Sequence, residues 1–391
     1  MNPIETRAHR RFYGRLNWRL TFLAAVLAIV GAFQISTELR PSFLPAGLHL
    51  FAYVGNTADG TVTAVDLIRL AAVATIPVGA VPTGIRAHPT RNEIWGLSSA
   101  GGYAWVLDAS TNRITARIPV GGSPYALDFS PDGSRAYVAA SGSDTVVAID
   151  CATRQIVARG RAGRRPWIAR VTPDGKLLLV SNRDDSTLSL LDARSLASIA
   201  TIRVAPEPEH IAILPDSSKA FVTSGGAGQL SVVDLKRKVL LANLALGGSA
   251  DNLILKPDGG ELYIASSSAH GLIIVNTETN EVDDFMLLGM SPAGGVLSRD
   301  AQTLYISDLA AGQVMRVAIQ IRRTIPPGPI RVGQGPRTCV LTPDGNMLLV
   351  VDGTSNDLAV IRTRTPSPDQ RGLITLIPVG SHPRDLAVKV F

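Results

Sequence analysis

The chain has 391 residues, of which 46% are hydrophobic and 18% are charged. This composition can bury a large core, and it excludes an intrinsically disordered chain. The formal net charge is +6, but residues 1–40 hold six arginines and two acids, so the rest of the chain carries only +2. Because a nucleic-acid-binding protein concentrates basic residues on its folded body, this distribution argues against a nucleic-acid partner.

The N-terminal region has the pattern of an export signal. Residues 1–19 are basic, residues 20–36 begin with the uncharged stretch LTFLAAVLAIVGAF, and residues 37–48 form a linker with two prolines. We expect residues 1–19 to stay cytoplasmic and residues 20–36 to be a signal anchor or a signal peptide. The apolar stretch is short for a membrane span, yet no small-x-small cleavage site follows it, so both alternatives stay open. Both predict a periplasmic or extracytoplasmic body, and the anchor would tether it to the inner membrane.

The sequence contains two cysteines, Cys151 and Cys339, and no Cys-x-x-Cys motif. They allow one disulfide at most, and the missing Cys-x-x-Cys-His motif argues against covalently attached c-type haem. We expect both thiols to be buried separately as small apolar side chains.

From residue 49 onward, a unit of about 42 residues repeats to the end of the chain. Each unit holds three apolar runs, and a fourth stretch such as ITARIPVG leads into a turn that ends in proline, or once in alanine. Four short strands in such a period are typical of a β-propeller blade. The turn residues follow one another in steps of 42, 42, 42, 42, 42, 44 and 47 residues, at Pro82, Pro124, Pro166, Pro208, Ala250, Pro292, Pro336 and Pro383.

Pro-Asp-Gly tripeptides separate the first and second apolar runs of several units, as in SPDG at residues 130–133. Proline presets the turn dihedral, aspartate bonds the local backbone and glycine accepts a positive φ. The pattern predicts hairpin turns, so we assign these aspartates to turn formation and not to catalysis.

The count of units predicts an all-β, eight-bladed β-propeller over residues 49–391, or seven blades if one repeat is degenerate, preceded by one N-terminal hydrophobic helix. The first unit lacks its opening strand, and the chain ends with RDLAVKVF, an opening strand that no Pro-Asp-Gly follows. We therefore expect the C-terminal strand to complete the first blade. This pairing of the N- and C-terminal strands would leave no free sheet edge in the ring.

The stretch RAYVAASGSDTVVAIDCATRQIVA resembles the YVTN β-propeller repeat, whose consensus combines Tyr-Val-x-Asn, Ser-Asp-x-Val, Asp-x-x-Thr and Pro-Val-Gly-x-x-Pro. The resemblance covers residues 50–391. It implies an exported or cell-surface binding propeller, but related propellers include lactonases and quinone- or haem-dependent enzymes, so the fold does not decide the activity. The family asparagine is kept at Asn56 and Asn182 and replaced at Ser98, Ala140, Ser224 and Ser266.

The innermost strands of a propeller line its channel, so the two residues after each blade proline are expected to ring one mouth. These positions vary between blades, whereas the framework positions repeat. Aromatic rings, with acids and guanidinium groups on opposite sides, suit a polar ligand that carries both charges, or a peptide. The alternative interpretation is that these acids and arginines form ordinary solvated ion pairs at the rim of the channel and bind no ligand. The predicted ligand-binding residues are Tyr125, Trp167, Glu209, His210, Asp251, Asn252, Arg337, Arg384 and Asp385.

Signals for an enzyme are weak in this sequence. No ligand spacing supports metal binding by Glu209, His210 and Asp251, and neither a Gly-x-Ser-x-Gly elbow nor a Walker loop is present. We therefore predict a monomeric binding or scaffold protein with no catalytic residues, metal or cofactor. Its partner would be a protein or another envelope component. A lactonase-like hydrolase using Glu209, Asp251 and His210 is one alternative, and a redox accessory propeller with non-covalent haem is another.

Overall fold

The computed structural model describes residues 48–391 except residues 327 and 365–371. The predicted basic leader at 1–19, the hydrophobic helix within 20–36 and nearly all of the linker lie outside the described residues. Within the described residues, no helix is long and apolar enough to cross a bilayer.

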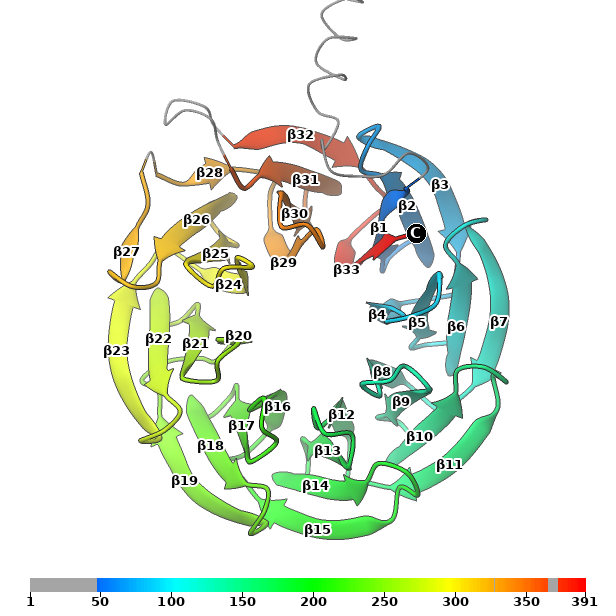
Figure 1. Ribbon diagram of the computed structural model, residues 1–391, viewed down its shortest axis with the longest axis vertical. Coiled ribbons are helices and arrows are strands. Elements are labelled where there is room, and N and C mark those ends of the chain that lie inside the picture. The colour runs from blue at the N-terminus through cyan, green and yellow to red at the C-terminus, as the bar shows by residue number, and fades with distance from the viewer. Residues whose placement is uncertain (1–47, 327, 365–371) are drawn as a thin grey trace, which may run out of the picture. The chain divides into compact units, whose positions relative to one another are not determined.

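The described chain forms eight antiparallel sheets arranged as blades around a central channel, as Figure 1 shows. The prediction of an all-β, eight-bladed propeller is therefore confirmed, and the seven-bladed alternative is wrong. Each blade begins at the channel, with one strand there and three further strands toward the outside. In the seventh blade the outer strand is split into two short pieces.

The strands are given from the channel outward. The first blade consists of β33 (Pro383–Val390), β1 (Leu50–Asn56), β2 (Thr61–Asp66) and β3 (Ala71–Pro77), and the second of β4 (Pro82–Ala87), β5 (Glu93–Ser98), β6 (Tyr103–Asp108) and β7 (Arg113–Pro119). The third consists of β8 (Pro124–Phe129), β9 (Arg135–Ala140), β10 (Thr145–Asp150) and β11 (Ile156–Arg161), and the fourth of β12 (Pro166–Val171), β13 (Leu177–Asn182), β14 (Thr187–Asp192) and β15 (Ser198–Arg203). The fifth consists of β16 (Pro208–Ile213), β17 (Lys219–Ser224), β18 (Gln229–Asp234) and β19 (Val239–Ala245), and the sixth of β20 (Asn252–Leu255), β21 (Glu261–Ser266), β22 (Gly271–Asn276) and β23 (Glu281–Leu287). The seventh consists of β24 (Pro292–Leu297), β25 (Thr303–Asp308), β26 (Gln313–Ala318), β27 (Arg323–Thr324) and β28 (Ile330–Arg331), and the eighth of β29 (Pro336–Leu341), β30 (Met347–Asp352), β31 (Asp357–Arg362) and β32 (Leu373–Pro378).

The two middle strands of each blade form the core. β9 and β10 are buried along almost their whole length, whereas the outer strand β11 alternates between half-buried and exposed residues except at the buried Gly160. Neighbouring blades cover both faces of the middle strands, which explains why the sequence shows continuous apolar runs there and not a polar–apolar alternation.

The two ends of the chain meet in the first blade. β33 pairs antiparallel with β1, and Ala387 lies opposite Tyr53. His49 and Phe391 extend this ladder by exchanging two backbone hydrogen bonds of 2.7 and 3.0 Å. The predicted closure by the terminal strands is present in the structure, and the innermost strand of the first blade comes from the C-terminus.

The Pro-Asp-Gly tripeptides form hairpin turns, as predicted. In the turn at residues 130–133, Gly133 has a φ of 70°, and a carboxylate oxygen of Asp132 accepts the backbone N–H of Ser134 at 3.0 Å. The hydroxyl of Ser130 donates to the same carboxylate and lowers the pKa of Asp132. The aspartate is thus used by its own turn.

Both cysteines are free and buried, as predicted. Burial raises the pKa of each thiol to about 12, so both are protonated at neutral pH.

Candidate ligand-binding site in the channel

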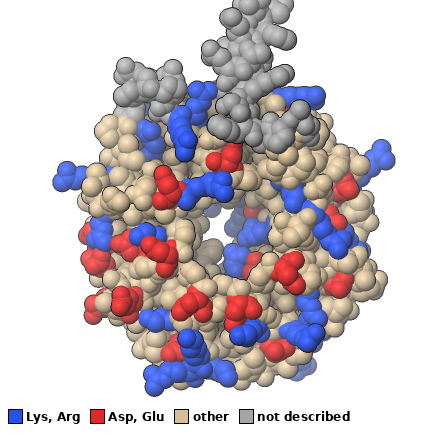
Figure 2. Space-filling view, viewed as in Figure 1, with Lys and Arg blue, Asp and Glu red and all other residues tan. Residues whose placement is uncertain are grey.

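A cavity of about 650 Å³ occupies the channel where the inner strands begin. Figure 2 shows an opening at the centre of the ring with basic side chains along its wall. All nine predicted ligand-binding residues line this cavity: Tyr125, Trp167, Glu209, His210, Asp251, Asn252, Arg337, Arg384 and Asp385.

A bulge at the start of the inner strands explains why two consecutive residues reach the cavity. The pairing of β12 with β13 jumps from Pro166 to Ala169, so Trp167 and Ile168 are left out of the ladder. The freed backbone N–H of Ile168 donates to the hydroxyl of Ser181 at 3.1 Å, which satisfies it inside the blade. The pairing skips two residues in the same way at the start of β16 and of β24.

The three acidic residues of the cavity already have partners in the protein. Glu209 accepts an ion pair from Arg183 at 3.0 Å, and Asp385 accepts the backbone N–H of Ile85 at 2.8 Å. Asp251 accepts a serine hydroxyl at 2.8 Å and a backbone N–H at 2.6 Å. These contacts leave the acids less available to a cationic ligand group. They also give no support to the hydrolase alternative, which requires Glu209 and Asp251 for catalysis.

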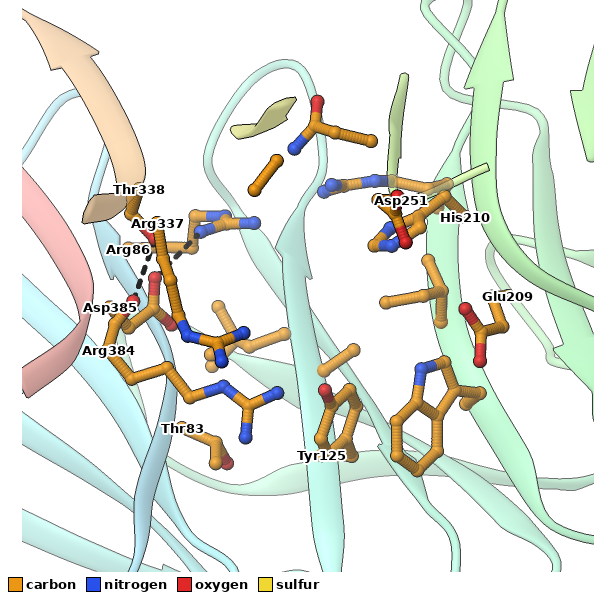
Figure 3. A pocket seen from close by; sticks show the side chains of 18 of the residues that line it. Thr83, Arg86, Tyr125, Glu209, His210, Asp251, Arg337, Thr338, Arg384 and Asp385 are labelled. Carbon is orange, nitrogen blue, oxygen red and sulfur yellow. Dashed lines mark hydrogen bonds and ion pairs between the residues drawn. The ribbon is translucent and has the colours of Figure 1, made fainter. Parts of the chain in front are cut away.

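Arg337 and Arg384 differ from the acids because their guanidinium groups have no ion-pair partner in the described part of the chain. They stand at the starts of β29 and β33, and Figure 3 shows both groups pointing toward the middle of the cavity. Among the described residues, no carboxylate lies at ion-pair distance from either one, whereas Arg86 and Arg183 each face an acid. Two neighbouring guanidinium groups without a carboxylate are suited to bind a carboxylate or phosphate.

Two aromatic rings lie in the same cavity. The rings of Tyr125 and Trp167 stack with their centroids 3.7 Å apart, and the guanidinium of Arg183 lies 4.8 Å from the Trp167 ring. Burial raises the pKa of Tyr125, although the positive charge of Arg384 partly opposes this shift. The phenol is therefore protonated at neutral pH and can donate a hydrogen bond to a ligand.

His210 lines the same cavity from β16, as Figure 3 shows. Burial, together with the positive charge of Arg170, lowers the pKa of its imidazole to about 4, although the charge of Asp251 partly opposes the shift. The ring is thus neutral at neutral pH. Within the part of the chain that the structure describes, no group of three or more His, Cys, Asp or Glu side chains is arranged to hold a metal ion.

Three further arginines line the cavity that were not among the ligand-binding residues predicted from the sequence. Arg86 and Arg170 stand four residues after their blade prolines, where strand alternation turns them toward the channel, so the sequence carried a usable signal for them. Arg170 faces Asp128 of the preceding blade at 3.4 Å. Arg183 follows the second strand of the fourth blade, and no pattern in the sequence marks it as a cavity residue.

Comparisons with known proteins agree with this architecture. A family model described as YNCE-like beta-propeller matches residues 127–317, from the third to the seventh blade. The solved structure of dihydro-heme d1 dehydrogenase NirN in complex with DHE is similar, with a TM-score of 0.70 and 16% identity over 86% of this chain and 74% of that chain. Hydrazine synthase from Kuenenia stuttgartiensis is also similar, with a TM-score of 0.57 and 20% identity over 72% of this chain and 95% of that chain. No curated protein matches the sequence. At these identities the structures show a shared propeller fold, and the YVTN assignment stays a prediction.

Proposed function

We propose that this propeller is an exported, membrane-tethered binding protein whose channel cavity takes up a small ligand with an anionic group. The observation that carries this proposal is the pair of guanidinium groups, Arg337 and Arg384, that have no ion-pair partner among the described residues and are directed into a cavity that contains stacked aromatic rings. The basic and apolar pattern of residues 1–36 supports export. The anionic group would come from a metabolite or from the end of a peptide in the cell envelope.

The chemistry of the cavity defines the ligand further. A carboxylate or phosphate between Arg337 and Arg384 would receive charge-assisted hydrogen bonds, and the Tyr125 hydroxyl offers a further donor. The stacked rings offer apolar surface to the rest of the ligand. A volume of about 650 Å³ matches the size of small-molecule sites. Arg86 and Arg170 also line the cavity and add positive potential, although each faces a carboxylate.

A pair of fluorescent probes tests this proposal. 1-Anilinonaphthalene-8-sulfonate has an aromatic body and an anionic group, and N-phenyl-1-naphthylamine has the same body without the charge. We expect the double variant Arg337→Gln/Arg384→Gln to weaken binding of the sulfonate about 10- to 100-fold, because two charge-assisted hydrogen bonds are lost. Binding of the neutral probe should stay nearly unchanged.

The control removes two exposed arginines from outer strands, Arg161→Gln/Arg203→Gln. It makes the same change in net charge without touching the cavity. Equal weakening by the two double variants would reduce the effect to general charge and would contradict the proposal. A wild-type protein that bound both probes equally well would also contradict it.

A second candidate function is that of an accessory protein for a haem-like macrocycle. His210 favours it, because a neutral imidazole in the cavity is a suitable iron ligand. Arg337 and Arg384 could bind the carboxylates of such a macrocycle. NirN, which shares the fold at 16% identity, is named a dihydro-heme d1 dehydrogenase. When bound, the macrocycle would supply redox chemistry that the side chains of the chain lack.

Haemin and visible absorbance separate the two candidates. If the second candidate holds, haemin mixed with the wild-type protein should show a shifted main absorbance band, and His210→Ala should abolish the shift while sulfonate binding persists. Identical haemin spectra with and without the protein would exclude this candidate and leave the first untouched.

A further inference from the structure

Two carboxyl groups face each other inside the eighth blade. Asp352 ends β30 and Asp357 begins β31, and the two residues are directly opposite in the ladder. Asp352 is fully buried and Asp357 is 9% exposed. One oxygen of Asp352 accepts the backbone N–H of Gly333 at 3.0 Å, but Oδ1 of each aspartate is buried without a hydrogen-bond partner.

No positive charge among the described residues, whether of lysine, arginine or histidine, forms an ion pair with these two aspartates. The surrounding elements present the thiol of Cys339 from β29, the Gly333 amide from the preceding loop and the Ser355 hydroxyl from the hairpin turn. Burial keeps the thiol protonated, because it raises its pKa to about 12. Two buried carboxylates without a cation cannot both ionise at low cost.

A shared proton resolves this conflict. If one carboxyl is protonated, its O–H can donate to the other, and the two unpartnered oxygens become each other's partners. Burial and the neighbouring Asp357 together raise the pKa of Asp352 to about 9, although the hydrogen bond from Gly333 partly opposes the shift. The pair therefore keeps a proton at neutral pH.

The hairpin turn between the two aspartates, residues 353–356, contacts the loops that immediately precede the cavity arginines Arg337 and Arg384. The backbone N–H groups of Gly353, Thr354 and Ser355 donate to Gly335 and Gln334, at 3.0, 3.0 and 3.2 Å. On the other side, the side chain and backbone of Asn356 accept the N–H groups of His382 and Val379, at 2.8 and 3.0 Å.

We propose that Asp352 and Asp357 share one proton, and that this proton holds the 353–356 turn against the two loops that position Arg337 and Arg384. The proposal rests on the proposed function and concerns the regulation of the same anion site. When the proton leaves, the two carboxylates repel each other and the turn moves apart from β30 and β31. The two guanidinium groups then lose their common orientation, so anion affinity falls at alkaline pH.

The fourth blade provides a matched control for this pair. Its equivalent residues are Asn182 and Thr187, and the Asn182 amide donates to the Thr187 hydroxyl at 3.0 Å. The backbone N–H of Gly163 donates to Asn182 at 3.1 Å, as Gly333 does to Asp352. Asp352→Asn/Asp357→Thr should therefore keep the contacts and remove the titration.

The test compares wild-type protein with Asp352→Asn/Asp357→Thr between about pH 6 and pH 10. The folded pKa of Asp352 is raised, so its stabilising contribution is present at low pH and is lost as the pH rises toward about 9. We expect the melting temperature of wild type to fall over this range relative to that of the variant. We also expect 1-anilinonaphthalene-8-sulfonate to bind wild type about tenfold more weakly at the alkaline end, a usual size for coupling between sites, and to bind the variant equally at both ends.

The outcomes distinguish this proposal from the one on which it rests. If the melting temperature and the probe affinity depended on pH in the same way for wild type and variant, the shared proton would be overturned. A melting temperature that rises with Ca²⁺ in wild type but not in the variant would assign the pair to a cation and would also overturn it. A pH-dependent difference in melting, with no probe binding to the cavity at any pH, would support the shared proton and refute the proposed anion site.

Discussion

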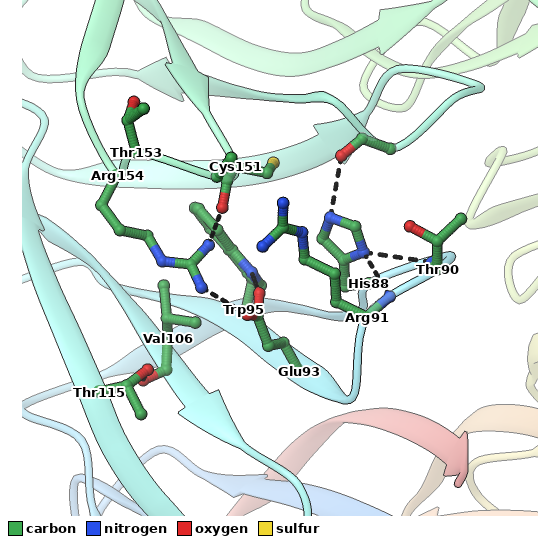
Figure 4. A network of polar contacts seen from close by, with 12 residues as sticks. His88, Thr90, Arg91, Glu93, Trp95, Val106, Thr115, Cys151, Thr153 and Arg154 are labelled. Atoms are coloured by element: carbon green, nitrogen blue, oxygen red, sulfur yellow. Dashed lines mark hydrogen bonds and ion pairs between the residues drawn. The ribbon is translucent and has the colours of Figure 1, made fainter.

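At the residue scale, His88 joins the second and third blades through its ring, as Figure 4 shows. Its Nδ1 accepts the backbone N–H groups of Thr90 and Arg91, at 3.2 and 3.0 Å. Because Nδ1 is an acceptor, the ring proton is on Nε2, which donates to the carbonyl of Gly133 at 2.9 Å. The ring must therefore be neutral to make all three hydrogen bonds.

This arrangement predicts an acid-sensitive stability. Burial lowers the pKa of His88, although the hydrogen bond to Gly133 partly opposes the shift. A lowered folded pKa means that the contribution is present above the ordinary pKa of about 6.5 and is lost as the pH falls below it. We expect His88→Asn to be less stable than wild type at about pH 7.5, by roughly 1–2 kcal/mol for the lost hydrogen bond. Its melting temperature should then fall less than that of wild type on acidification to about pH 5.

The control for this prediction is His382→Asn. His382 is exposed and has a φ of 49°, a conformation that asparagine tolerates. The melting temperature of the His382→Asn variant should change with pH as that of wild type does. If the His88→Asn profile also followed that of wild type, the neutral buried ring would not be the source of the acid sensitivity.

At the element scale, neighbouring blades are held together by a contact that repeats around the ring. In several blades the first residue of the second strand reaches the turn between the third and fourth strands of the next blade. Its partner lies about 60 residues later in the chain, so the repeat length sets the spacing. The contacts are Glu93 with Arg154 at 2.5 Å, Arg135 with the Arg194 carbonyl at 2.5 Å, Lys219 with the Thr277 carbonyl at 2.9 Å, and Glu261 with Arg322 at 3.1 Å.

The contact between Glu93 and Arg154 allows a direct test of this packing. The Arg154 guanidinium also lies 5.0 Å from the Trp95 ring, and the Trp95 N–H donates to Glu93 at 3.0 Å (Figure 4). We expect Arg154→Met to lower the free energy of unfolding by about 2 kcal/mol, because a half-buried carboxylate loses its cation. Arg69→Met is the control, since its guanidinium is highly exposed beside Asp66, and should change stability by less than about 0.5 kcal/mol. Urea unfolding measures both variants, and equal effects would show that the contact between blades adds nothing.

The strands and turns could be predicted because each blade repeats the same local physics. A proline, a Pro-Asp-Gly turn and an apolar run depend on interactions within one blade, so they can be recognised from the local sequence. The positions directly after Pro124 and Pro166 therefore predicted that Tyr125 and Trp167 lie at the channel. The pairing of charges could not be predicted in this way. Arg183 reaches Glu209 from the adjacent blade, and only the three-dimensional arrangement shows that this acid is occupied while Arg384 is not.

At the scale of the whole molecule, the ring depends on one strand that comes from the far end of the chain. β33 supplies the innermost strand of the first blade, with Leu386 and Ala387 buried in the core. The amino group of Lys389, which is also buried, donates to the His88 carbonyl of the second blade at 2.7 Å. β33 also carries Arg384 into the cavity. Stability and the proposed binding site therefore share this strand.

Removal and replacement of that strand test both roles. We expect deletion of residues 383–391 to abolish cooperative unfolding at the wild-type temperature. A typical free energy of unfolding is only about 5–15 kcal/mol, and the loss of a whole core strand removes most or all of it. A synthetic peptide with the sequence PRDLAVKVF should bind the truncated protein and restore both the melting transition and 1-anilinonaphthalene-8-sulfonate binding, as an added strand does at an open sheet edge. The same peptide with Arg384→Gln should restore melting but leave sulfonate binding weak, and a scrambled peptide should restore neither. A truncated protein that melted like the intact one would show that the ring does not depend on its closure, and equal sulfonate binding with both matched peptides would remove Arg384 from the site.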